Sequence, residues 1–165
     1  MTHSQQERLF IDWVRQYDAV LWRIARTYAP WGEHLDLHQD LLIALWHALP
    51  LYRDQASPST FLYRVGLNCA LNWVRERTRY RARHTDLTKV HTREQPPGES
   101  DRVKQLYAAL NRMSEADRTL ALLYLDDLSY REIGEILGLT ETNVGAKLTR
   151  LRRRLTDELN KEPHQ

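Results

Sequence analysis

The chain has 165 residues and a mass of 19.6 kDa, enough for one ordinary domain or two small ones, which excludes a large multidomain enzyme. With 42% hydrophobic residues, 28% charged residues, a net charge of +2 and only 6 Gly and 6 Pro, the composition favours a folded, helix-rich protein over a disordered or fibrous one. Apolar runs fall short of the roughly 20 residues of a membrane span, the first residues lack a signal-peptide pattern, and one cysteine excludes an internal disulfide framework. We therefore expect a cytoplasmic protein without membrane insertion.

Three helices are predicted in the first half of the chain. Apolar residues recur every three or four positions over 7–29 and again over 36–49, as on the buried face of an amphipathic helix. The third helix is predicted to begin around residues 57–60, where a Ser or Thr cap and Pro58 in the first turn are start signals, and to extend to Arg83.

A flexible linker is predicted over residues 87–100. The helical periodicity is lost from residue 84 onward, and the segment QPPGES, which begins at Gln95, has the composition of a linker. The expected fold class is therefore all-α, with two small helical domains at 1–86 and 101–165, the second of them a helix-turn-helix domain.

Four helices are predicted after the linker. The first covers residues 101–111, and the second opens at a capping box in which Ser114 caps the helix and Asp117 reaches back. A clearer box of the same kind, Ser129 and Glu132, opens the third. No strand pattern, repeat or low-complexity tract competes with this all-helical interpretation.

The last two helices form a helix-turn-helix pattern. Gly138 stands where a left-handed turn ends the third helix, and the fourth is predicted from Glu141 to about Leu159. Apolar residues pack between the two helices, so the polar side of the second faces outward, as a recognition helix in a major groove requires. A plain two-helix hairpin is the alternative. The residues predicted to contact duplex DNA are Thr142, Asn143, Ala146, Lys147, Arg150, Arg153 and Arg154.

Positive charge is concentrated in two blocks. Residues 75–93 hold seven basic and two acidic side chains, and residues 141–154 hold five basic and one acidic. The sequence between and around these blocks is mostly acidic. Two separate basic blocks are typical of two contacts with one phosphate backbone, although basic residues at helix ends also interact favourably with the helix dipole.

The third helix carries amide and guanidinium groups on one face, flanked by Tyr63 and Trp73. Asn is a poor helix former, and two Asn side chains on one face beside Arg and aromatic rings suit single-stranded bases, which stack on rings and expose their hydrogen-bonding edges. Two Asn residues bonded within the domain are the alternative. The predicted DNA-binding residues are Arg64, Asn68, Asn72, Trp73, Arg75 and Arg79.

With these motifs in place, the chain resembles the extracytoplasmic-function (ECF) group of bacterial RNA polymerase sigma-70 factors. Segment 36–46, DLHQDLLIALW, resembles the family's polymerase-binding segment, and segment 61–75, FLYRVGLNCALNWVR, resembles its promoter-melting helix. Segments 113–118 and 128–140, with the following helix, resemble its reader of the upstream promoter element. The resemblance extends over about residues 7–159.

This resemblance implies a sigma factor that directs core polymerase to specific promoters and initiates DNA melting. Asp36, Gln39 and Asp40 match the surface that binds the β′ clamp helices. Asn68 and Asn72 match positions that recognise the minus-10 element as a single strand. The second domain would read the minus-35 element as duplex. Further partners implied are the β flap and an anti-sigma factor, and the free protein is expected to be a monomer.

An enzyme and a conventional regulator are the alternatives considered. His34, His38 and His47 have a spacing compatible with a metal, but no Cys pair or carboxylate set accompanies them, and Cys69 lies among apolar neighbours. We expect that the protein is not an enzyme and that it binds no metal or cofactor. A helix-turn-helix transcription regulator, with residues 1–90 as a sensor or dimerisation domain, would bind duplex DNA alone, usually as a dimer.

Overall fold

The computed structural model describes residues 1–84 and 100–161. Every regular element within these ranges is helical, which confirms the predicted all-α class. The chain divides into two compact units, and the division falls between Pro97 and Gly98. Apart from Ser100, the predicted linker lies outside the described residues.

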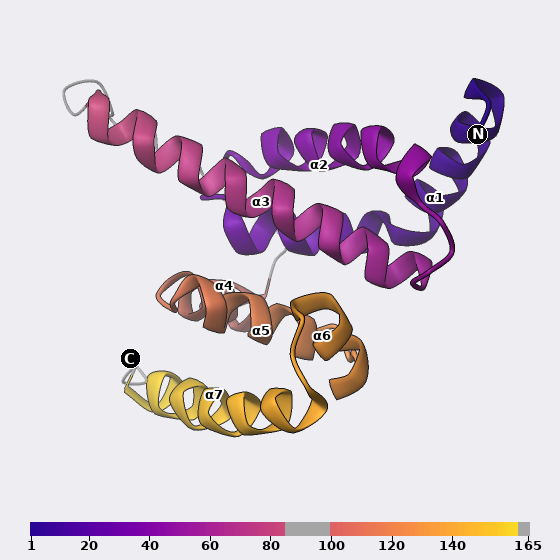
Figure 1. The fold of residues 1–165 in the computed structure, drawn as a ribbon. Coiled ribbons are helices and arrows are strands. Elements are labelled where there is room, and N and C mark those ends of the chain that lie inside the picture. Colours follow the sequence, from indigo (N-terminus) through magenta and orange to yellow (C-terminus); the bar gives the residue numbers. More distant parts are fainter. Residues whose placement is uncertain (85–99, 162–165) are drawn as a thin grey trace. The chain divides into compact units, whose positions relative to one another are not determined.

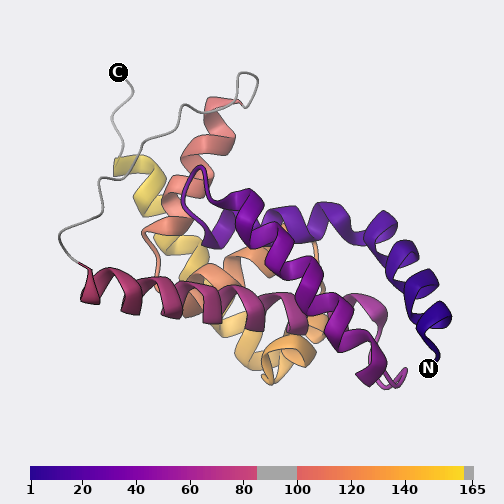
Figure 2. The same cartoon turned by 90° about the horizontal axis from the view of Figure 1, so that it is seen from above.

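The first unit contains α1 (His3–Tyr28), α2 (His34–Ala48), a short 3-10 turn η1 (Leu49–Leu51) and α3 (Pro58–Arg83), and each α-helix packs against the other two (Figures 1 and 2). Helix α1 begins four residues earlier than predicted because Thr2 and Gln5 form a capping box there. Helix α2 begins two residues earlier than predicted, and α3 begins at the predicted cap, with Ser57 Oγ accepting from the Thr60 amide at 3.1 Å.

Leucines and aromatic rings form the core of this unit. The rings of Trp13, Tyr52 and Phe61 meet edge to face, with centroids 5.0 to 6.0 Å apart, and join α1 to the start of α3. Tyr63 is only 2% exposed and belongs to this core, so the prediction that it flanks the Asn-bearing face is wrong. The largest side chains with less than 2% exposure in this core are those of Leu21, Ile24, Leu37, Leu41, Leu45, Leu49 and Leu62.

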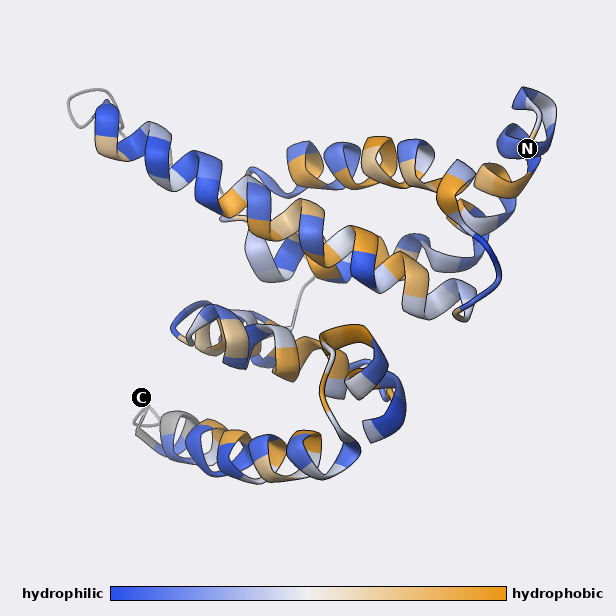
Figure 3. Cartoon of the chain, in the orientation of Figure 1, coloured by the Kyte–Doolittle hydropathy of each residue, from blue (hydrophilic) through white to orange (hydrophobic). Residues whose placement is uncertain are grey.

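The C-terminal turns of α3 extend beyond α1 and α2 (Figures 1 and 2). Hydrophilic positions dominate these turns (Figure 3), and residues 79–84 are all exposed. The projecting end is held to the rest of the unit through Glu33, which forms ion pairs with Arg77 and Arg81. The first basic block therefore begins on a helix end that the fold leaves accessible.

The second unit contains α4 (Asp101–Asn111), α5 (Glu115–Leu125), α6 (Tyr130–Leu137) and α7 (Glu141–Lys161) (Figure 1). The predicted capping box at Ser129 is confirmed, since Glu132 accepts from the Ser129 amide at 2.8 Å and the Glu132 amide donates to Ser129 Oγ at 3.2 Å. Only half of the box predicted at Ser114 forms. Its hydroxyl accepts from the Asp117 amide at 3.2 Å, but the Asp117 carboxylate pairs with Arg154 instead of reaching back.

The turn between α6 and α7 is tight. Gly138 adopts the predicted left-handed conformation, with φ of 70°, and the Leu139 amide donates to the Gly134 carbonyl at 2.9 Å. A Cβ atom at position 134 would lie 2.5 Å from the Leu139 carbonyl oxygen, whereas one at Gly145 on α7 would meet the Tyr130 ring at 3.5 Å, an ordinary contact. The first glycine is required for this turn and the second is not.

We expect Gly134→Ala to destabilise the second unit by about 2 kcal/mol, because the added methyl group displaces the backbone of the turn. Urea unfolding of the full chain, followed by circular dichroism, measures this change. Wild-type stability would contradict the steric argument.

We expect Gly145→Ala, the same substitution at a site with room, to stabilise the second unit by about 1 kcal/mol, because alanine is the better helix former. The same unfolding experiment tests it. A loss of stability would show that Tyr130 does not accommodate the methyl group.

Candidate nucleic-acid interface

One face of α3 presents the predicted row of polar side chains to solvent. Five of the six predicted residues, Arg64, Asn68, Asn72, Arg75 and Arg79, are exposed. The sixth, Trp73, is half-buried. The three- and four-residue spacing thus brings the amides and guanidinium groups onto accessible surface, as the helical period requires.

A hollow between α2 and α3 joins two sets of predicted site residues. Asp40, from the predicted polymerase-binding set, lines it together with Asn68, Asn72 and Trp73. Sequence reasoning missed this arrangement because the two sets are about thirty positions apart in the chain. The remaining residues that line the hollow are Ile43, Ala44, Val65, Cys69 and Glu76.

An acidic cluster surrounds Asp40. Partial burial, and then repulsion from Asp36 and Glu76, raise the pKa of the Asp40 carboxyl above its ordinary value. A positive charge brought to this place would relieve the repulsion and favour the ionised carboxylate. The cluster therefore suits a basic partner.

The outer face of α2 mixes these acids with apolar side chains. Asp36, Gln39 and Asp40 are exposed as predicted, and Leu35 and Ile43, on either side of them in the sequence, are each 55% exposed. Large apolar side chains next to polar ones are typical of a surface that binds another protein. The two apolar residues are a part of this surface that sequence reasoning missed.

Trp73 is in contact with a residue that sequence reasoning did not single out. The guanidinium carbon of Arg77 lies 4.5 Å from the centre of the indole ring, and Arg77 in turn forms an ion pair with Glu33. The four-residue spacing of Trp73 and Arg77 on one helix is a signal that could have identified the first contact. No local pattern indicates the ion pair with Glu33, because Glu33 is far from Arg77 in the sequence and lies at the start of α2.

Helix α7 presents the predicted outward face. Val144, Leu148 and Leu151 are buried. The exposed residues are Thr142, Asn143, Ala146, Lys147, Arg150, Arg153 and Arg154. The Thr140 hydroxyl accepts from the Asn143 amide at 3.2 Å and so caps the start of the helix.

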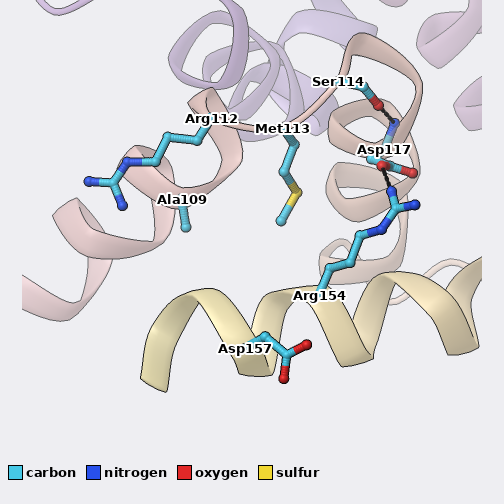
Figure 4. Close-up of a pocket in the computed structure, with 7 residues that line it drawn as sticks. All are labelled: Ala109, Arg112, Met113, Ser114, Asp117, Arg154 and Asp157. Atoms are coloured by element: carbon cyan, nitrogen blue, oxygen red, sulfur yellow. Dashed lines mark hydrogen bonds and ion pairs between the residues drawn. The ribbon is translucent and has the colours of Figure 1, made fainter. Parts of the chain in front are cut away.

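Two arginines of the second basic block are engaged within the unit. Arg154 reaches across to the Asp117 carboxylate at the start of α5, beside a pocket that Met113 and Asp157 also line (Figure 4). Arg152 donates to the Tyr124 hydroxyl at 2.7 Å, and its guanidinium lies 4.8 Å from the centre of that ring. The structure thus separates Arg154, which secures α7 to α5, from the other predicted residues.

Two further residues singled out in the sequence, His38 and Cys69, lie within the first unit. His38 is buried, its Nε2 donates to the Asp18 carboxylate at 2.8 Å, and its ring stacks on Trp22 with centroids 4.0 Å apart. Cys69 is half-buried, and burial raises the pKa of its thiol to about 11. Among residues 1–84 and 100–161, no group of three or more His, Cys, Asp or Glu side chains could hold a metal ion. None of the helices in these ranges is long and apolar enough to cross a membrane.

Two helical units, one with amides and guanidinium groups along an exposed helix and the other with a basic, exposed face on the last helix of a helix-turn-helix, have the features of a bipartite nucleic-acid-binding protein. Comparison with known protein families agrees with this two-part organisation. Residues 13–80 match Sigma-70 region 2, and residues 104–155 match Sigma-70 region 4. The chain belongs to the sigma-70 family of RNA polymerase sigma factors, in its extracytoplasmic-function group.

Two curated relatives are similar to this chain over most of its length. RNA polymerase sigma factor YlaC of Bacillus subtilis is 28% identical over 134 residues, which cover 76% of this chain and 77% of YlaC. RNA polymerase sigma factor NccH of Alcaligenes xylosoxydans xylosoxydans is 27% identical over 157 residues, 87% of this chain and 82% of NccH.

Two solved structures of protein complexes share the fold. RpoE in complex with the anti-sigma factor NepR, from Bartonella quintana, superimposes with a TM-score of 0.74 at 20% identity, covering 93% of this chain and 98% of RpoE. CnrH in complex with the cytosolic domain of CnrY gives a TM-score of 0.70 at 22% identity, covering 95% of this chain and 91% of CnrH.

Proposed function

We propose that this sigma factor opens promoters through α3 and reads the upstream element through α7. In this proposal residues 1–86 bind core polymerase and the minus-10 element, residues 87–100 are the linker, and residues 101–165 bind the minus-35 element. The observation that carries it is the hollow in which Asn68 and Asn72 lie beside Trp73. Amide edges beside an aromatic ring can hydrogen-bond and stack on a base taken out of the duplex.

The polymerase contacts follow from the surface of α2. Asp36, Gln39 and Asp40, with the exposed Leu35 and Ile43, form an acidic and apolar surface for the β′ clamp helices. The second unit is proposed to meet the β flap. The protein acts as a transcription initiation factor in the cytoplasm, without catalysing a reaction of its own, and is monomeric when free.

An anti-sigma factor is a further proposed partner. The similar structure of RpoE was solved with an anti-sigma factor, and that of CnrH with the cytosolic domain of CnrY. The exposed apolar residues of α2 could be covered by such a partner, which would then compete with polymerase for the same surface.

Run-off transcription tests the proposed function. Purified protein is added to core polymerase on a genomic library, and the transcripts are mapped. We expect initiation at a limited set of sites that share an upstream and a downstream element. Core polymerase that starts at no specific site, or a dimer that binds duplex operators without polymerase, would contradict the proposal.

Two adjacent arginines of α7, Arg153 and Arg154, are expected to behave differently. Arg153→Gln should reduce the salt dependence of holoenzyme binding to promoter duplex by about one unit of slope, since it removes one phosphate contact. Arg154→Gln should leave the slope unchanged, because Arg154 pairs with Asp117. Fluorescence anisotropy over a series of salt concentrations measures both slopes, and equal losses would contradict the distinction.

A further inference from the structure

An ion pair connects the start of α2 to the basic end of α3. Glu33 occupies the N-cap position of α2, where its carbonyl accepts from the Leu37 amide at 3.1 Å. Its carboxylate pairs with Arg77, and Arg81 lies 3.9 Å away. The pair is partly buried, with side-chain exposures of 25% for Glu33 and 39% for Arg77.

Stability alone does not account for this pair. One carboxylate oxygen of Glu33 and the Nε atom of Arg77 are buried without a hydrogen-bond partner among the described residues. Desolvation of charged groups offsets much of their attraction, so a partly buried pair with unsatisfied atoms contributes little net stability. The ion pair has another effect, which is to fix the position of the Arg77 guanidinium.

That guanidinium lies on the indole of Trp73. The distance to the ring centre is 4.5 Å, within the range of a cation–π contact. Trp73 lines two depressions at once: the groove that contains Glu33 and Arg77, and the hollow that contains Asn68 and Asn72. Trp73 therefore borders both depressions.

We propose that Glu33 is a positioning residue for promoter opening. By holding Arg77 against Trp73, it fixes the indole as a wall of the Asn68 and Asn72 hollow, where an unpaired base binds. Arg77 thus serves the ring and not a phosphate, although it lies within the first basic block. This inference rests on the proposed function of α3. It adds two residues, Glu33 and Arg77, that position Trp73 without contacting DNA themselves.

Promoter opening by the reconstituted holoenzyme tests the inference. On a promoter identified by run-off transcription, Glu33→Gln and Arg77→Gln should each slow opening about fivefold, the worth of an ordered cation–π contact. The double variant should be no slower than Arg77→Gln, because Glu33 acts through Arg77. Core affinity should remain at the wild-type value. The control is Asp12→Asn, which removes a carboxylate from the exposed surface of α1.

A second measurement needs neither polymerase nor promoter. The difference in emission between each protein and its Trp73→Phe counterpart isolates the fluorescence of Trp73, and acrylamide quenching reports access to the ring. Quenching of Trp73 should increase in Glu33→Gln and in Arg77→Gln but not in Asp12→Asn.

The outcomes separate this inference from the proposed function. Unchanged quenching of Trp73 in Glu33→Gln overturns the inference. So does a double variant in which the two reductions in opening rate add, or a loss of affinity for core polymerase as large as the loss in opening rate. Increased quenching with wild-type opening also overturns it, because the ring position would not matter to opening. Failure of the wild-type holoenzyme to open any promoter contradicts the proposed function itself.

Discussion

Replacing Asn68 and Asn72 together by alanine is expected to slow promoter opening about 100-fold, since each lost amide contact to a base is worth about 1 to 2 kcal/mol. Both side chains are exposed on α3 and line the hollow beside Trp73. Neither is needed for the core of the unit, so the variant should fold normally. Permanganate reactivity of unpaired thymines in holoenzyme–promoter complexes measures the opening.

The matched control for this prediction is Thr78→Ala on the same helix. Thr78 is exposed, and its hydroxyl donates to the Val74 carbonyl of its own helix, at 2.9 Å. This variant should open promoters at the wild-type rate. Wild-type opening by the double Asn variant would mean that α3 contacts the promoter through other groups.

Asp40→Arg is expected to weaken binding to core polymerase about 100-fold, because like charges brought together in an interface cost several kcal/mol. Asp40 is the centre of an acidic cluster with Asp36 and Glu76. Affinity measured without DNA isolates this effect from any change in the neighbouring hollow. Asp12→Arg makes the same change of charge on the exposed surface of α1 and should leave affinity unaltered.

The raised pKa of Asp40 adds a pH dependence to the same interface. A basic partner favours the ionised carboxylate, so its pKa falls on binding and affinity is fully present above the pKa of the free protein. Affinity should therefore decline as the pH falls through that value, and this part of the decline should be absent in Asp40→Asn. An identical pH profile in Asp40→Asn, or wild-type affinity of Asp40→Arg, would place the polymerase contact elsewhere.

The hollow between α2 and α3 gives these predictions a common structural basis. Residues proposed for polymerase binding and for base recognition line the same depression, with Trp73 between it and the groove of Glu33 and Arg77. Binding of a basic partner at Asp40 would change the charge beside Asn68 and Asn72. Assembly with polymerase and recognition of the open strand are thus expected to be energetically coupled.

Local sequence signals were sufficient to predict the helices and the faces that they present to solvent. Proline, the serine caps and Gly138 mark helix ends. They do so through the local backbone conformation and through hydrogen bonds to the backbone amides that have no partner within the helix, and both depend on a few consecutive residues. Periodicity likewise predicted that Asn68, Asn72 and Lys147 face solvent, because apolar neighbours three and four positions away must be buried. These features were predictable because each is decided within one or two turns of helix.

Tertiary structure decided which long side chains are engaged and by what. Arg77 and Arg154 belong to basic blocks in the sequence, yet one lies on Trp73 beside Glu33 and the other pairs with Asp117. Tyr63 enters the core although it adjoins the exposed row. Composition and spacing determined the all-helical fold and the faces of its helices. Only the packing of distant segments decided the ion pairs and the shared hollow, because such contacts depend on distances between helices that no local pattern encodes.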